Sequence, residues 1–219
     1  MPVLVIPGAG DLIAFANGLN AMAMLDTRIK QIVTSPLDPL ADGLARMGGG
    51  ANALTVVGFA IGLVAAALIA DESFLMGIAF LTLNRLADVL DGMVARRMGT
   101  TPIGGFLDAS LDLFVYAAIP FAFALAHQQD ALAACFLLMG LMVSAIPGLV
   151  ARASMPEQAK RRVLTLCGHS ETFIAFALMC VAPRWMFSLI AYFYGALCFF
   201  SAGVSFASAV VQIRATEKS

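Results

Sequence analysis

Long apolar segments dominate this sequence and limit what the chain can fold into. A membrane-spanning helix needs about 20 mostly apolar residues. Hydrophobic residues make up 61% of the 219 positions and charged residues only 12%, about half the share usual in soluble domains. The sequence therefore predicts an all-α, polytopic membrane protein with six transmembrane helices, over residues 52–70, 74–95, 105–126, 131–150, 170–183 and 185–211.

Basic residues lie almost entirely on one side of these predicted spans. Eleven of the 13 Lys and Arg residues fall in the termini or in the loops on the same side, whereas the opposite loops contribute only Arg184. Cytoplasmic loops carry such an excess of Lys and Arg. We therefore expect a multi-pass protein of the inner cell membrane with both termini in the cytoplasm. The net charge of −1 gives no indication of nucleic-acid binding.

An amphipathic segment precedes the first predicted span. Ser35 and Pro36 are residue types favoured at a helix start. Apolar residues then recur at helical spacing, at Leu37, Leu40, Leu44 and Met47. The pattern predicts a helix on the cytoplasmic membrane surface, or equally a helix packed on the cytoplasmic end of the bundle. The expected organisation is an extension over residues 1–34, a transmembrane domain over 35–214 and a cytoplasmic tail over 215–219.

Four of the 14 acidic residues lie close together in the sequence, beside or inside apolar segments. Asp88 and Asp91 share a face of the second predicted span, and Asp108 and Asp112 share a face of the third. Because the connecting segment is short, the two helices should be antiparallel neighbours whose carboxylates converge near the cytoplasmic end. Converging carboxylates ionise together only with cations between them. Oxygen ligands favour Mg²⁺ or Mn²⁺, and Ca²⁺ also suits them.

This pattern predicts two divalent cations that clamp a phosphoryl group during an in-line displacement. Gly92 and Ala95 let a ligand approach the helix closely, and Arg96 offers paired donors to a phosphate. Two alternatives remain for the same carboxylates. They could form intramembrane ion pairs with Arg85, Arg96 and Arg97, or line the ion pathway of a cation-coupled transporter. The small residues and the arginine beside the acids favour a bound phosphate over a bare ion.

Eight positions of this region resemble the signature of the CDP-alcohol phosphotransferase (CDP-alcohol phosphatidyltransferase) family. They are Asp88-x-x-Asp91-Gly92-x-x-Ala95-Arg96, followed by Gly104-x-x-x-Asp108-x-x-x-Asp112. Enzymes of this family transfer a substituted phosphate from a CDP-linked alcohol to a hydroxyl and release CMP. The family usually has eight residues between the arginine and the next glycine, whereas seven separate Arg96 from Gly104 here. The connecting loop is therefore one residue shorter.

The resemblance implies a role for each matching residue. Two divalent cations would be held by Asp88, Asp91, Asp108 and Asp112, and Asp112 would also act as the general base toward the acceptor hydroxyl. The cytidine diphosphate would be bound by Gly92, Ala95, Arg96, Gly104, Asn52 and Thr55. The donor would be CDP-diacylglycerol or another CDP-alcohol, in phospholipid biosynthesis, and the chain can be expected to form a homodimer. A lipid-binding relative without catalysis is the remaining alternative, because the loop is short.

Polar residues around the start of the fifth predicted span bear on the acceptor. A basic cluster precedes this span, at Arg152, Lys160, Arg161 and Arg162. It either sets the membrane topology or binds a phosphorylated acceptor such as glycerol 3-phosphate or inositol phosphate. Glycerol 3-phosphate is our working expectation. His169, Glu171 and Thr172 follow at the start of the span. They either face the acceptor or cap the helix and bond between helices, and we favour the second interpretation.

Overall fold

The computed structural model describes residues 34, 36–46, 50–154 and 167–217. The described residues from Asp38 onward belong to one compact unit, which holds the candidate site. All regular structure in the described part is helical, which confirms the all-α prediction. Residues 36–46 are helical, at the place where the amphipathic segment was predicted. The predicted extension, residues 1–34, lies almost wholly outside the described residues.

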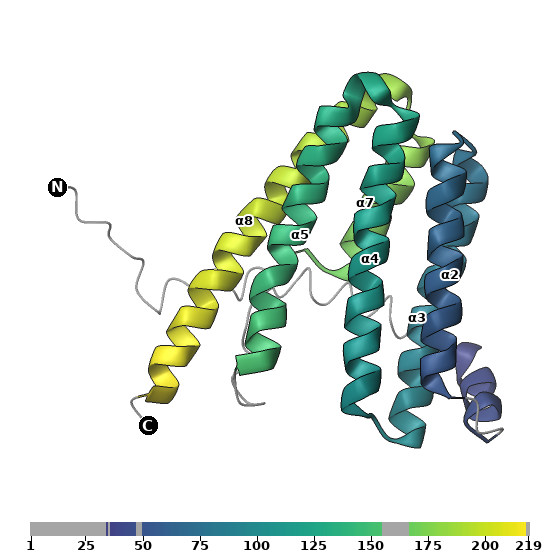
Figure 1. Ribbon diagram of the computed structural model, residues 1–219, viewed down its shortest axis with the longest axis vertical. Helices are drawn as coiled ribbons and strands as arrows, with labels where there is room; N and C mark the ends of the chain where they lie inside the picture. The colour runs from purple at the N-terminus through teal and green to yellow at the C-terminus, as the bar shows by residue number, and fades with distance from the viewer. Residues whose placement is uncertain (1–33, 35, 47–49, 155–166, 218–219) are drawn as a thin grey trace. The chain divides into compact units, whose positions relative to one another are not determined.

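The helices from α2 to α5 follow one another with short connections, as do α7 and α8, whereas most of the segment between α5 and α7 lies outside the described residues (Figure 1). They are α2 (Ala51–Ala70), α3 (Phe74–Met98), α4 (Pro102–Ala126), the 3-10 helix η1 (Gln128–Asp130), α5 (Ala131–Ser154), α7 (His169–Val181) and α8 (Arg184–Glu217). Four stretches of the described residues are long and apolar enough to cross a membrane, over 51–70, 102–126, 128–151 and 184–211. The other two predicted spans differ, because α3 carries Arg85, Asp88 and Asp91, and α7 has only 13 residues.

The turn between α3 and α4 is encoded locally. Gly99 follows the last residue of α3 with a φ of 98°, a conformation that glycine adopts without strain. Thr101 then caps α4, because its side-chain oxygen accepts a hydrogen bond from the Gly104 N–H at 3.0 Å. Pro102 occupies the first turn of α4, where its missing N–H costs nothing. The chain therefore reverses direction within three residues.

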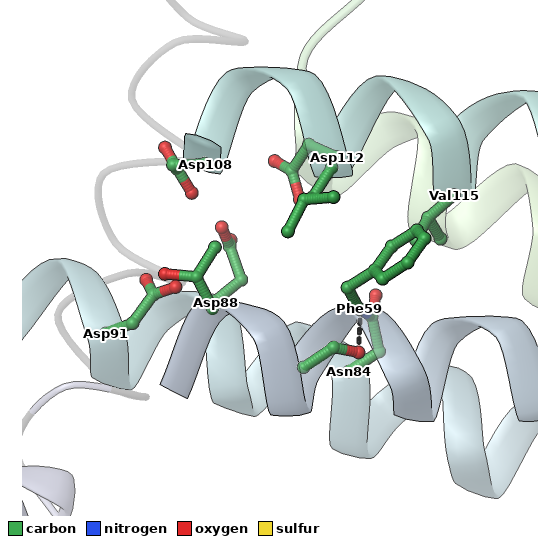
Figure 2. A pocket seen from close by; sticks show the side chains of 10 residues that line it. Phe59, Asn84, Asp88, Asp91, Asp108, Asp112 and Val115 are labelled. Carbon is green, nitrogen blue, oxygen red and sulfur yellow. Dashed lines mark hydrogen bonds between the residues drawn. The ribbon is translucent and has the colours of Figure 1, made fainter. Parts of the chain in front are cut away.

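The reversal does not bring α3 and α4 into close backbone contact. Among the described helices, α2 packs extensively against both α3 and α4, whereas α3 and α4 have no such pairing with each other. The predicted antiparallel pair is thus held apart by a third helix. This arrangement leaves a pocket between α3 and α4, and α2 forms its base (Figure 2).

Two glycines allow α2 to lie this close to its neighbours. A Cβ on Gly58 would lie 3.1 Å from the Cβ of Ala87, and one on Gly62 would lie 2.7 Å from Val115 Cγ2. Small residues four apart on one helix face permit such close approach in membrane proteins. The side-chain amide of Asn84 on α3 donates a hydrogen bond to the Gly58 carbonyl at 2.9 Å. This buried bond fixes α3 against α2 beside the pocket.

The rest of the bundle packs through another glycine contact. A Cβ on Gly140 of α5 would lie 2.7 Å from the carbonyl oxygen of Gly195 on α8. A separate aromatic group is formed by Phe123, Phe176 and Phe187, which are fully buried. The short α7 contacts α3 and α8, and its first residue faces the pocket region described next.

Candidate active site

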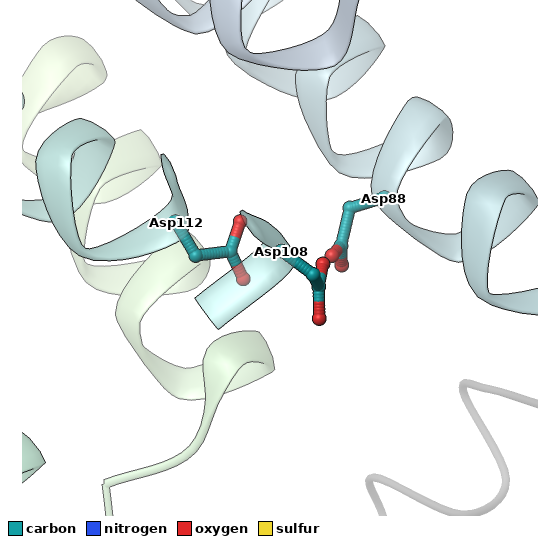
Figure 3. A group of neighbouring side chains, drawn as sticks. All are labelled: Asp88, Asp108 and Asp112. Carbon is teal, nitrogen blue, oxygen red and sulfur yellow. The ribbon is translucent and has the colours of Figure 1, made fainter. Parts of the chain in front are cut away.

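Three of the four predicted metal ligands converge between α3 and α4. One carboxylate oxygen each from Asp88, Asp108 and Asp112 lies within 4.8 Å of the other two (Figure 3). The four-residue spacing puts Asp108 and Asp112 on one face of α4, and the reversal of the chain between α3 and α4 brings Asp88 to the same place. Such a set of hard oxygen donors fits a divalent cation such as Mg²⁺ or Mn²⁺.

Asp91 lines the same pocket but lies outside this group of three (Figure 2). Only 4% of Asp91 is exposed, so it is the most buried of the four carboxylates. Thr55 on α2 lines the pocket beside it. Phe59 and Val115 line the end that lies deeper in the bundle. The pocket therefore has a strongly acidic part and an apolar part.

The predicted nucleotide-binding residues form two pairs near the α3–α4 turn. A Cβ on Gly104 would come within 2.9 Å of Asn52 Oδ1, so the start of α2 reaches the start of α4. A Cβ on Gly92 would lie 3.5 Å from Arg96 Nη1, so this guanidinium lies over the glycine. Asn52 and Arg96 are exposed, and Ala95 is half-buried between them and the core.

Of the three arginines considered, Arg85 is the one that the described residues show paired with the cluster. Arg85 forms a salt bridge with Asp88, one helical turn away. Arg97 instead binds Asp38 at 2.7 Å and Asp42 at 2.5 Å, on the helix that precedes α2. Its charge is therefore directed away from the carboxylate cluster. The pair between Arg85 and Asp88 accounts for one of the carboxylates, and oxygens of Asp88, Asp108 and Asp112 lie close enough together to hold a cation.

Two further residues border Asp112. His169, the first residue of α7, stacks on Tyr116 with ring centroids 5.4 Å apart, and its Nδ1 is hydrogen-bonded to the Tyr116 hydroxyl. The same nitrogen lies 3.8 Å from Asp112 Oδ2. The sequence interpretation missed Tyr116, although its position four residues after Asp112 puts both side chains on one helix face.

Among the polar residues at the start of the fifth predicted span, Thr172 forms the bonds expected of a helix-bonding group, whereas Glu171 Oε2 is buried without a hydrogen-bond partner among the described residues. The Thr172 hydroxyl donates to the Gly168 carbonyl at 2.9 Å and lies 2.8 Å from the Tyr194 hydroxyl. His169 was assigned to the same role but lies at the pocket instead. Lys160, Arg161 and Arg162 lie outside the described residues, and only the backbone of Arg152, in α5, is described.

Comparison with known proteins decides the family. Residues 50–211 match the family model described as CDP-alcohol phosphatidyltransferase. The chain belongs to this family. It is therefore a membrane phosphotransferase that moves a substituted phosphate from a CDP-alcohol to a hydroxyl. This assignment favours catalysis over the cation-coupled transporter, and the carboxylate cluster fits the divalent cation that such an enzyme needs.

Relatives and solved structures agree with this assignment. The chain is 38% identical over 186 residues to inner membrane protein YnjF of Escherichia coli strain K12, covering 80% of this chain and 90% of that one. It is 29% identical to the archaetidylinositol phosphate synthase of Methanothermobacter thermautotrophicus, covering 76% and 88% of the two chains. The fold is similar to that of Mycobacterium tuberculosis phosphatidylinositol phosphate synthase with CDP-DAG bound. That likeness has a TM-score of 0.68 at 20% identity, covering 78% of this chain and 92% of the other.

Proposed function

We propose that this enzyme transfers the phosphatidyl group of CDP-diacylglycerol to a small alcohol and releases CMP. The observation that carries the proposal is the group of three carboxylates with oxygens within 4.8 Å of one another. The solved structure of similar fold with CDP-DAG bound supports the choice of donor. Glycerol 3-phosphate is the working acceptor, and the predicted basic cluster of Arg152, Lys160, Arg161 and Arg162 would bind its phosphate.

We assign two divalent cations to Asp88, Asp91, Asp108 and Asp112, with Asp112 completing the second site. Mg²⁺ and Mn²⁺ suit these oxygen ligands best, and Ca²⁺ is an acceptable substitute. When bound, such cations neutralise charge that develops on the transferred phosphoryl group. A solved structure of similar fold, in complex with manganese and citrate, supports this assignment.

The protein's own residues would perform the remaining chemistry. Asp112 removes the proton from the acceptor hydroxyl, which requires hydrogen-bond reach between them. The acceptor oxygen forms a bond to the β-phosphorus of the donor while the bond to the bridging oxygen breaks, and CMP departs with that oxygen. Arg96 and the backbone at Gly92 hold the pyrophosphate in line for this displacement.

The membrane arrangement follows from the same proposal. Six spans, with α3 and α7 included, place the carboxylates at the cytoplasmic end, where the nucleotide enters from water. The helix over residues 36–46 lies on the cytoplasmic surface. The E. coli relative is named an inner membrane protein, which supports location in the inner cell membrane. We expect the enzyme to form a homodimer.

The proposal is tested with purified enzyme in detergent micelles, CDP-diacylglycerol and a panel of alcohols. We expect CMP release that needs Mg²⁺ or Mn²⁺ and stops with a chelator. Asp112→Asn should lower the rate at least about 100-fold, the lower end for loss of a general base. Asp71→Asn is the matched control, because Asp71 is an exposed carboxylate just beyond α2.

Three outcomes would contradict the proposal. Wild-type activity in Asp112→Asn would remove this residue from the mechanism. Donor binding without turnover for any acceptor would indicate the lipid-binding alternative. CMP release that is unchanged by a chelator would remove the cations from the reaction.

A further inference from the structure

The last turn of α3 and the chain reversal after it lie outside the packed core. Met93 and Val94 are buried, whereas every residue from Arg96 to Ile103 is exposed. Arg96, the proposed pyrophosphate ligand, belongs to this exposed stretch. A ligand-binding group gives its full affinity only if its orientation is fixed before the ligand arrives. Contacts other than core packing must therefore hold the end of α3.

Arg97 ties this end of α3 to the helix that precedes α2. Its Nη2 donates a hydrogen bond to Asp38 at 2.7 Å, and its Nε donates one to Asp42 at 2.5 Å. Its Nη1 donates to the Met93 carbonyl at 3.3 Å, one turn earlier on α3. All three guanidinium nitrogens are therefore engaged, and the planar group is fixed in one orientation. Asp38 and Asp42 lie four residues apart, so both share the helix face that meets Arg97.

The position of Arg97 on α3 lets it act on its neighbour Arg96 rather than on the carboxylate cluster. About two and a half helical turns separate Arg97 from Asp88, so the two side chains leave opposite faces of the helix. Arg96, by contrast, lies over Gly92, a predicted nucleotide-binding residue. Fixing the Arg97 guanidinium fixes the rotation of the last turn about the helix axis. The direction in which Arg96 leaves α3 is then fixed as well.

The charge of the helix before α2 fits a partner inside the protein. Helices that lie on membrane surfaces usually carry Lys and Arg on their polar face, because anionic headgroups attract these residues. Asp38 and Asp42 have the opposite sign, so such headgroups repel them. Ala41, which precedes Asp42 in the sequence, is fully buried. The two aspartates therefore suit contact with Arg97 better than contact with lipid.

We propose that Asp38 and Asp42 position the nucleotide-binding end of α3. Through Arg97 they hold its last turn, so that Arg96 meets the donor pyrophosphate in one orientation. In this role neither aspartate contacts the donor, and both are positioning residues. The inference rests on the proposed function and adds two residues that lie before the first membrane-spanning helix in the sequence.

The test measures CDP binding by calorimetry at saturating Mn²⁺, beside the kinetics with CDP-diacylglycerol. In the double variant Asp38→Asn/Asp42→Asn, the Kd for CDP and the KM for the donor should each rise about fivefold, the upper end for an exposed ion pair. The KM for the acceptor and kcat should change less than about twofold, because the lost contact affects donor binding in the ground and transition states equally. Asp71→Asn, an exposed carboxylate beyond α2, is the matched control and should behave like the wild type.

A double-mutant cycle separates positioning from direct contact with the nucleotide. Arg97→Gln should weaken CDP binding as much as the double aspartate variant does, and the triple variant should be no weaker than either. Arg97→Lys keeps the charge but not the fork of donors, so its affinity should be intermediate. Because the ion pairs are exposed, higher ionic strength should weaken CDP binding more in the wild type than in Arg97→Gln.

An unchanged CDP affinity in the double aspartate variant would overturn the inference. Losses that add up in the triple variant would show that Arg97 itself binds the nucleotide, and would overturn it too. Equal rises in the KM values of donor and acceptor would assign the ion pairs a general structural role, with the same consequence. A wild type that binds CDP but releases no CMP with any acceptor would overturn the proposed function alone, because the CDP affinities decide this inference without turnover.

Discussion

When divalent cations are absent, removing one carboxylate from the cluster should stabilise the protein. When they are present, the same change should reduce the stabilisation that they give. Asp108→Asn is the informative change, because Asp108 belongs to the group of three and is not the proposed base. Asparagine has the same shape and can still form hydrogen bonds, but it carries no charge. The substitution therefore isolates the electrostatic contribution of one ligand.

The geometry sets a lower limit for this effect. Two unit charges 4.8 Å apart repel by about 0.9 kcal/mol at the dielectric constant of water and about 3.5 kcal/mol at an effective value of 20. Loss of one charge from the group of three removes two such repulsions. The free energy of unfolding should thus rise by at least about 1.7 kcal/mol in the presence of a chelator. For a chain of this size, that raises Tm by about 3–7 °C.

With saturating Mn²⁺, the wild type should instead be more stable than Asp108→Asn. A cation at 100 times its Kd stabilises the wild type by about 2.7 kcal/mol, whereas the variant has lost a ligand and gains less. The assay is thermal unfolding in detergent micelles, with either a chelator or Mn²⁺, at about pH 8, well above the usual pKa of a carboxyl group. Asp71→Asn should behave like the wild type in both conditions. A less stable Asp108→Asn in chelator, or an undiminished gain with Mn²⁺, would refute the cation site.

Three further predictions concern packing and pH. Gly140→Val should destabilise the contact between α5 and α8 by more than about 1 kcal/mol, because its Cβ meets the Gly195 carbonyl; Gly203→Val, with open space around its Cβ, should not. Asn84→Leu should lower Tm by about 2–4 °C through loss of its bond to the Gly58 carbonyl. Burial lowers the pKa of His127, so the folded state binds fewer protons than the unfolded state. Tm should therefore fall as pH drops below about 6.5, and His127→Phe should flatten this slope.

Much of the fold follows from local sequence patterns. The lengths of the apolar segments predicted the helices α2, α4, α5 and α8 to within a few residues at most ends. The spacing of Asp88, Asp108 and Asp112 predicted that their carboxylates converge, since three- and four-residue intervals fix a helix face. Gly99, Thr101 and Pro102 explain why α3 and α4 reverse direction. All of these features depend on interactions within one helix or one turn.

The features that the sequence did not predict all depend on contacts between residues far apart in the chain. Arg97 was considered a partner for the cluster but binds Asp38 and Asp42, more than 50 positions earlier. Tyr116 and His169 are 53 positions apart, so no local pattern indicates that they stack. The separation of α3 from α4 depends on α2, which fits between its neighbours through Gly58 and Gly62. Helical periodicity specifies faces, whereas side-chain volume and competition among partners decide which faces meet.

The charges around the pocket explain how a mainly apolar chain keeps four carboxylates near its membrane segments. Arg85 compensates Asp88 within α3, and Arg97 is held elsewhere by Asp38 and Asp42. With two divalent cations, the donor pyrophosphate and Arg96 in place, the formal charges of the proposed site sum to zero. A neutral alcohol leaves this balance intact, whereas a phosphorylated acceptor requires further positive charge from outside the pocket. We propose that the basic residues that precede α7 in the sequence supply this charge, so neutralising them should lower activity toward phosphorylated acceptors only.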